Sequence, residues 1–196
     1  MAAENQFEIL VQEAKKYGKS LGIGPDFFLS LYNEKSDWAF IIQIDALHET
    51  ASREALSRLI RVDGVEPETE DTAAEFVQNL NYQGRTSIIR LLKLAGVPKD
   101  TTEFVEHARM IRNAYAHDIR ALKRPIFEII NNRPERAKIL RRVAFIEHYD
   151  EKKFLEMVER DPRMFRFLII QQCMMFLFGL HQTFGRRGKR AKAVMA

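Results

Sequence analysis

The stretch DTTEFVEHARMIRNAYAHDIRAL, residues 100–122, decides the fold class because its apolar residues recur with the period of a helix. Asp100 followed by Glu103 is typical of a helix start. At 100° per residue from Arg109, one apolar face lies between about 200° and 280°. It holds Phe104, Ala108, Ile111, Tyr115, Ile119 and Leu122. We expect one helix here, with this face turned toward a core.

The same helix predicts a polar face between about 0° and 80°. That face holds Glu106, Arg109, Asn113, His117 and Arg120. Arg112 falls near 300°, at the border of the apolar face. Because an unpaired charge is costly to bury, a covered arginine at this position needs an acid or an anion.

A second helix, from about 37 to 61 after a Ser36 cap, supplies candidate acids. Asp45, Glu49 and Ser52 fall within its apolar arc. Carboxylates are rarely buried unpaired. We therefore predict an ion pair from Asp45 or Glu49 to Arg112, which would orient the two helices.

The rest of the chain also carries helix signals. Gly96 is placed to end the segment TSIIRLLKLA, and Asp161-Pro162 is a typical helix start. Thr72-Ala-Ala-Glu75 is a capping-box pattern that follows a predicted loop at 62–71. No stretch alternates like a strand with β-branched enrichment.

These patterns predict an all-α fold, a single helical bundle with additional N- and C-terminal helices. The 196 residues suit one domain, which we place at 1–184. The net charge of +4 is concentrated in a basic tail, residues 185–196. Removing its five Lys and Arg from the total of 31 leaves 26, against 27 Asp and Glu. The tail fits a nucleic-acid arm or a disordered terminus, and we expect the second.

The longest apolar run, FLIIQQCMMFLFGL at 167–180, has 14 residues with Gln171 and Gln172 near its centre. A membrane span needs about 18 or more, so we expect a buried helix or a subunit interface and no membrane. The N-terminus lacks the apolar core of a signal peptide. Cys173 is the single cysteine, which excludes an intrachain disulfide. We expect a cytoplasmic protein.

The segment Arg112-Asn113-Ala114-Tyr115-Ala116-His117 resembles the motif of the HEPN superfamily: arginine, a polar residue, and histidine after four intervening positions. The resemblance covers about 36–122. It implies a helical bundle that is commonly dimeric and in many members a metal-independent ribonuclease. The segment IRNAYAHD, with LKLAG upstream, is also similar to the mannitol operon repressor family, which implies a regulatory role.

The HEPN resemblance implies His117 as general acid or base, Arg112 as phosphate stabiliser, and Asn113 as a positioning group. Arg109 and Arg120, on the face with His117, would hold flanking phosphates. Neither metal nor cofactor is implied. Arg112 and His117 lie about 140° apart on an ideal helix. Their joint action therefore needs a distorted helix or two motifs that meet in a homodimer.

The leading hypothesis is a dimeric endoribonuclease for single-stranded RNA, of the toxin or phage-defence kind, with an antitoxin or regulatory protein as partner. The alternative is a non-catalytic helical regulator, similar to the mannitol repressor, that binds a protein or nucleic acid. A third hypothesis is a structural assembly protein whose dimer is held by residues 165–180. The remaining histidines lack metal-ligand spacing, and no glycine-rich phosphate loop or serine nucleophile elbow is present.

Overall fold

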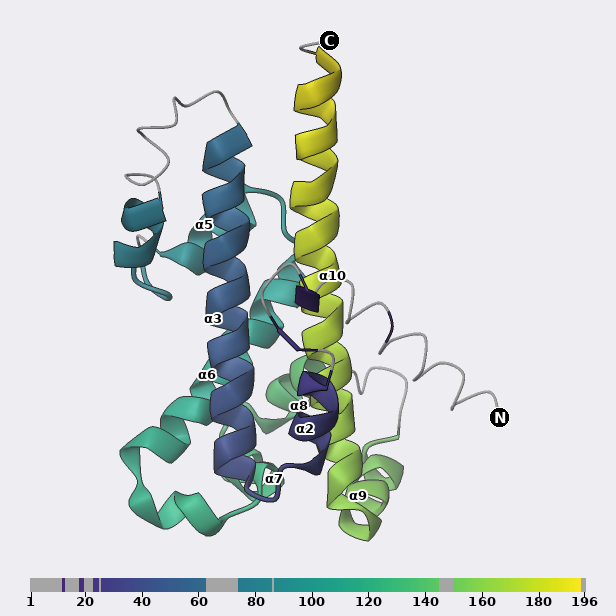
Figure 1. The fold of residues 1–196 in the computed structure, drawn as a ribbon. Coiled ribbons are helices and arrows are strands. Elements are labelled where there is room, and N and C mark those ends of the chain that lie inside the picture. The colour runs from purple at the N-terminus through teal and green to yellow at the C-terminus, as the bar shows by residue number, and fades with distance from the viewer. Residues whose placement is uncertain are drawn as a thin grey trace.

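The computed structural model describes residues 26–62, 74–85, 87–144 and 150–194, together with 12, 18, 19, 23 and 24. Within these ranges the chain forms helices joined by turns, and no strand is present. Figure 1 shows the helices packed together in one bundle. The predicted all-α bundle is confirmed. The predicted loop at 62–71 and the cap residue Thr72 lie almost entirely outside the described residues.

Three helices form the centre of the bundle: α3 (Asp37–Val62), α6 (Lys99–His117) and α10 (Pro162–Val194). α3 and α10 lie side by side and run in the same direction, and α6 packs against both (Figure 1). Phe40 and Ile44 of α3, Phe104 of α6 and Phe176 of α10 are fully buried between them. The apolar stripes read from the sequence thus meet in one core.

Shorter helices surround this centre. They are α2 (Phe27–Asn33), α5 (Ile88–Leu94), the 3-10 helix η1 (Ile119–Lys123), α7 (Ile126–Asn131), α8 (Arg136–Ala144) and α9 (Glu151–Arg160). Another short helix covers 74–79. η1 and α7 follow α6 directly and pack back against it.

Several predicted helix ends are confirmed. The Ser36 hydroxyl accepts a hydrogen bond from the Ala39 amide at 3.3 Å, at the start of α3. α10 begins at Pro162, and Asp161 accepts from the Arg163 amide at 3.0 Å. Gly96 follows α5 with a φ of +87°, a conformation that favours glycine. α6 begins one residue before the predicted Asp100, after Pro98.

The predicted continuation of α6 to Leu122 is wrong, because the helix ends at His117. Asp118 is extended, and its carboxylate accepts from the Arg120 amide at 3.0 Å, which starts η1. The change of helix type alters which way the following side chains face. Ile119 is 82% exposed, and Leu122 is also exposed, so neither belongs to the core stripe. Asp is a favourable capping residue, so Asp118 was the sequence signal that a new helix starts after His117.

The apolar run 167–180 lies in the core. This agrees with the first of its two predicted locations, a buried helix. Ile170, Cys173 and Leu177 are buried. Within the described residues, Pro162–Phe184 is long and apolar enough to cross a membrane, but half of the apolar window is buried inside the fold. Because α3 packs along it, we interpret this segment as the central helix of the bundle.

The backbone of α10 continues to Val194, through the segment where the sequence analysis expects a disordered tail from residue 185. Arg, Lys and Ala all favour helix, and extending an existing helix avoids the cost of nucleation. The side chains of this segment lie outside the described residues, so its role as a nucleic-acid arm stays a prediction.

Candidate functional site

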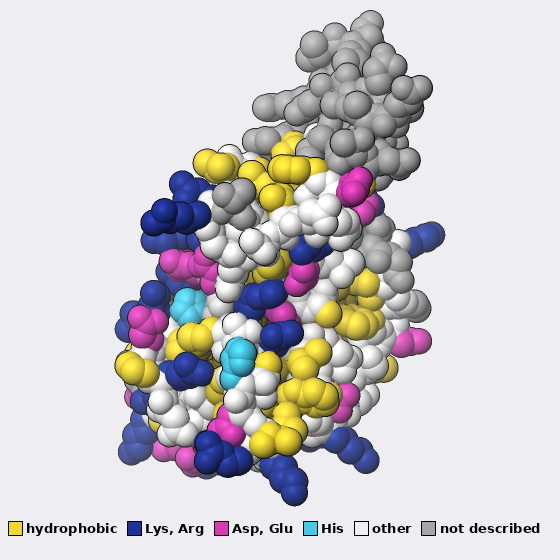
Figure 2. Space-filling model, turned by 90° about the vertical axis from the view of Figure 1, so that its left-hand side faces the viewer, with side chains coloured by type: hydrophobic (Ala, Val, Ile, Leu, Met, Phe, Trp, Pro, Cys, Tyr) yellow, Lys and Arg dark blue, Asp and Glu magenta, His cyan; other side chains and the backbone are white. Residues whose placement is uncertain are grey.

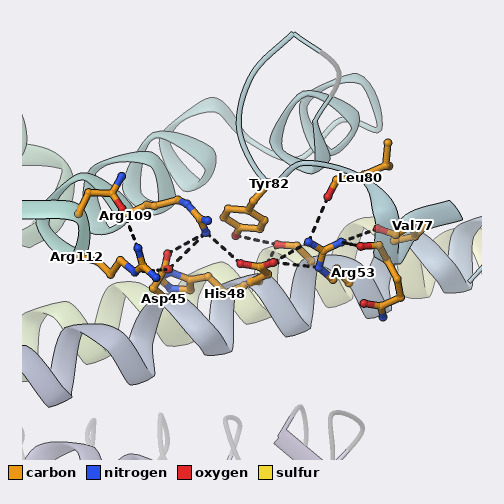
Figure 3. Close-up of polar contacts among 12 residues, drawn as sticks. Asp45, His48, Arg53, Val77, Leu80, Tyr82, Arg109 and Arg112 are labelled. Atoms are coloured by element: carbon orange, nitrogen blue, oxygen red, sulfur yellow. Dashed lines mark hydrogen bonds and ion pairs between the residues drawn. The ribbon is translucent and has the colours of Figure 1, made fainter. Parts of the chain in front are cut away.

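A network of charged side chains joins α3 to α6 (Figure 3). Arg109 Nη1 lies 3.4 Å from Asp45 Oδ2 and 3.1 Å from Glu49 Oε2. Arg112 Nε lies 3.6 Å from the same Asp45 oxygen. The predicted ion pair between Asp45 and Arg112 is therefore confirmed. Arg109 is a second partner that the sequence analysis placed on the solvent face.

The two carboxylates differ in their electrostatics. Burial raises the pKa of the Asp45 carboxyl, and the guanidinium groups of Arg109 and Arg112 oppose that rise. Burial also disfavours ionisation of Glu49, but hydrogen bonds from Arg53 and Arg109 outweigh it and lower its pKa. Asp45 therefore depends on its two arginines to remain charged, and it holds both side chains in place.

Segment 77–82 covers this network from the outside. The Arg53 guanidinium donates to the carbonyl oxygens of Val77 at 2.6 Å and Leu80 at 3.2 Å. The Tyr82 ring lies under the Arg109 guanidinium, whose central carbon is 4.6 Å from the ring centroid. The Tyr82 and Ser52 hydroxyls lie 3.2 Å apart. Arg53 and Tyr82 thus attach the segment to both α3 and α6.

Arg109 is consequently a structural arginine in this fold. Its side chain is only 21% exposed, and its guanidinium already contacts two carboxylates and an aromatic ring. The predicted role in holding a flanking phosphate finds no support in this position. A helical wheel gives the direction of the Cα–Cβ bond, whereas a long arginine can extend sideways to a neighbouring helix.

Arg112 connects the network to the next residue of the motif. Its Nη1 donates to Asn113 Oδ1 at 3.1 Å. With its oxygen engaged, the Asn113 carboxamide retains an NH2 group that can donate elsewhere. A continuous series of contacts therefore runs from Glu49 through Arg109, Asp45 and Arg112 to Asn113.

Asn113 and His117 line a pocket of about 590 Å³ on the far side of α6. Its apolar lining consists of Met110, Ala114, Ala121 and Ile129, and its polar lining of Gln83, Asn113, His117, Asp118, Arg124, Asn132 and Arg133. We call this the motif pocket. Arg112 is not part of its lining, so the motif arginine and histidine are linked through Asn113 and do not face each other.

The motif pocket combines an imidazole with two guanidinium groups. His117 is exposed at the last position of α6, and the described part of the chain provides no hydrogen bond to its ring. Arg124 Nε lies 3.6 Å from Glu128 Oε1. The Arg124 carbonyl oxygen accepts a hydrogen bond from the Tyr115 hydroxyl at 2.7 Å. Arg133 forms no ion pair with any described residue. Such a set of donors suits an anion.

Arg120, the second predicted phosphate ligand, does not line the motif pocket. Its guanidinium pairs with Asp118 at 3.0 Å, and its side chain is 82% exposed. The predicted shared face with His117 is wrong because α6 ends between the two residues. This pairing lowers the pKa of the Asp118 carboxyl, chiefly through the hydrogen bond from the Arg120 side chain.

Besides Asp118, which directly follows His117, four polar residues of the pocket were not predicted: Gln83, Arg124, Asn132 and Arg133. They come from the turns before α5 and around α7. Nothing local in the sequence places these turns beside α6. Pro125, which separates η1 from α7, was the available sign that the chain turns back after the motif.

The face in Figure 2 is the side of the molecule that carries α5 and the end of α6. Lys and Arg side chains gather there beside histidine and carboxylate groups. Among the described residues, no group of three His, Cys, Asp or Glu side chains could hold a metal ion. The chain matches no protein-family model, no curated protein and no solved structure. The site itself therefore carries the functional argument.

Proposed function

We propose that this chain is a metal-independent endoribonuclease of HEPN type that cleaves single-stranded RNA. One observation supports this most strongly: the motif pocket joins the His117 imidazole to the Asn113 carboxamide and to the guanidinium groups of Arg124 and Arg133. A proton-transfer group thus lies in the same cavity as donors for phosphate oxygens.

The reaction uses the 2′-hydroxyl of the RNA as nucleophile. The 2′-oxygen attacks the adjacent phosphorus while the bond from phosphorus to the 5′-oxygen breaks. One imidazole accepts the proton of the hydroxyl, and an acid donates a proton to the leaving oxygen. Histidine suits both roles because it gains and loses protons near neutral pH. The products are a 2′,3′-cyclic phosphate and a 5′-hydroxyl.

Negative charge develops on the phosphate oxygens during this attack, and arginine stabilises it through directed hydrogen bonds. We assign this role to Arg124 and Arg133, which line the motif pocket. Arg112 acts as a positioning residue: Asp45 holds its guanidinium, which holds Asn113 in turn. The Asn113 NH2 group then donates to the substrate.

Each chain supplies a single His117, whereas the reaction needs a base and an acid. We therefore place the active site in a homodimer, in which two motif pockets contribute one imidazole each. The exposed position of His117 at the end of α6 is compatible with such an approach.

The chemistry is tested with a labelled single-stranded RNA in EDTA. We expect cleavage that leaves a 2′,3′-cyclic phosphate, and no cleavage at a position where the 2′-hydroxyl is methylated. Cleavage that persists at the methylated position, or that EDTA abolishes, would contradict the proposal. Binding of the intact RNA without any cleavage would favour the non-catalytic regulator.

A further inference from the structure

A second pocket, of about 580 Å³, lies next to the motif pocket. It is lined by Gln83, Gly84, Ser87, Ile89, Arg90, Lys93, Leu94 and Glu106. Gln83 lines both pockets and forms the wall between them. We call the second one the α5 pocket, because half of its lining residues lie in that helix.

The position of Gln83 depends on the charged network described above. The Ile88 amide donates to the Asn81 carbonyl at 2.9 Å, and the Ile89 amide donates to the Tyr82 carbonyl at 3.2 Å. Tyr82 is in turn fixed by Ser52 and by the Arg109 guanidinium. The wall between the pockets is thus anchored to Arg109, which shares the Asp45 carboxylate with Arg112.

The α5 pocket has the charge and the surface that a nucleotide needs. Arg90 is exposed, and no described residue forms an ion pair or hydrogen bond with its side chain. Lys93 lies 2.7 Å from Glu106 and neutralises that carboxylate, so the pocket keeps the positive charge of Arg90. Leu94 is 76% exposed and offers an apolar surface for a base.

Both pockets open along α6. Glu106 lines the α5 pocket. Met110 and Asn113 line the motif pocket, and they follow Glu106 by four and seven residues, or about 6 and 10.5 Å along a helix. A ligand that fills both pockets must therefore extend beyond a single base. A single strand meets this requirement because its bases are free to turn away from one another.

We propose that the α5 pocket binds the nucleotide next to the cleaved one, with Arg90 contacting its phosphate. This inference rests on the proposed function for the identity of the ligand. Arg90 then contributes to the affinity for RNA longer than one nucleotide, and has no part in proton transfer at His117.

The test measures binding of a labelled, fully 2′-O-methylated pentanucleotide of mixed sequence to native protein, Arg90→Ala and Arg160→Ala. Arg160 is an exposed arginine on α9, remote from α5 (Figure 1), and serves as the matched control. We expect Arg90→Ala to weaken binding about tenfold, as for one hydrogen bond to a charged group. The plot of log K against log salt should become shallower by about 0.7. Arg160→Ala should change neither, and a nucleoside 3′-monophosphate should bind Arg90→Ala as well as native protein.

An unchanged pentanucleotide affinity and salt slope in Arg90→Ala would overturn the inference. Equal weakening of the mononucleotide would also overturn it, because Arg90 would then act on the motif pocket. Because the probe cannot be cleaved, the result is independent of catalysis. Arg90-dependent binding by a protein that never cuts RNA would reject the proposed function and retain the α5 pocket.

Discussion

His48 is a fully buried histidine between the three central helices. Its ring meets those of Phe104 and Phe176 edge to face, each at a centroid distance of 5.0 Å. Neither ring nitrogen has a hydrogen-bond partner among the described residues. Burial lowers the pKa of His48 to about 3, so the fold holds the neutral imidazole.

This residue predicts that acid destabilises the fold. Above the ordinary pKa of 6.5, His48 is neutral in both states and its contribution to stability is constant. Below pH 6.5, the unfolded chain takes up a proton that the folded chain excludes. The free energy of unfolding therefore decreases as the pH is lowered. Between pH 7.5 and 5.0, the protonation of His48 should lower the free energy of unfolding of the native protein by about 2 kcal/mol. We expect His48→Leu not to show this decrease. Urea unfolding of native protein, His48→Leu and the surface control His117→Leu at both pH values measures this. Equal pH dependence in all three would contradict it.

At the scale of helices, the pairing of α3 with α6 is set by apolar contacts and by one buried acid. The side chain of Asp45 is 7% exposed and contacts two arginines of α6. Without Asp45, Arg109 would still pair with Glu49, whereas Arg112 would lose its ion pair. Removing one partner from a covered ion pair costs far more than removing an exposed one.

We therefore expect Asp45→Ala to lower the free energy of unfolding by about 2–3 kcal/mol. Glu54→Ala is the matched control on the same helix, because it breaks only the exposed ion pair with Arg58 and should cost less than about 1 kcal/mol. Chemical unfolding at neutral pH compares the two variants. Similar losses would show that the Asp45 network contributes no more than a surface pair.

The limits of sequence prediction also lie at the scale of helices. The acids of α3 and the pairing of Asp45 with Arg112 could be predicted because burial demands a partner for a charge. The end of α6 at His117 was missed because the apolar period continues past Asp118, whose carboxylate begins η1. Arg124 and Arg133 were missed for another reason. Their place beside His117 comes from how the chain turns back, which no local pattern records.

In the whole molecule, the apolar core and the motif pocket occupy different regions. The core of α3, α6 and α10 holds the large apolar side chains, whereas the motif pocket lies at one end of α6 among short elements. The charged network that ends at Asn113 connects them, as do Ala121 and Ile129, which are buried with the core and line the pocket. This arrangement allows surface variants of the pocket to retain the fold.

A composite site predicts that activity depends on protein concentration. We expect the cleavage rate per chain to fall when the protein is diluted below its dimer dissociation constant, because each monomer has one His117. Cleavage assays and sedimentation at matched concentrations measure both quantities. Full activity per chain in samples that sediment as monomers would show that a single motif pocket is sufficient.

Whether His117 acts as a general acid or base is tested by the single-turnover cleavage rate of one single-stranded RNA in EDTA, with native protein and with His117→Ala. The substitution removes an exposed side chain without described hydrogen bonds, so the fold should be unchanged. We predict a rate loss of at least about a hundredfold, as for a general acid or base. Equal rates in the two proteins would contradict the assignment of His117 and of the motif pocket as the active site.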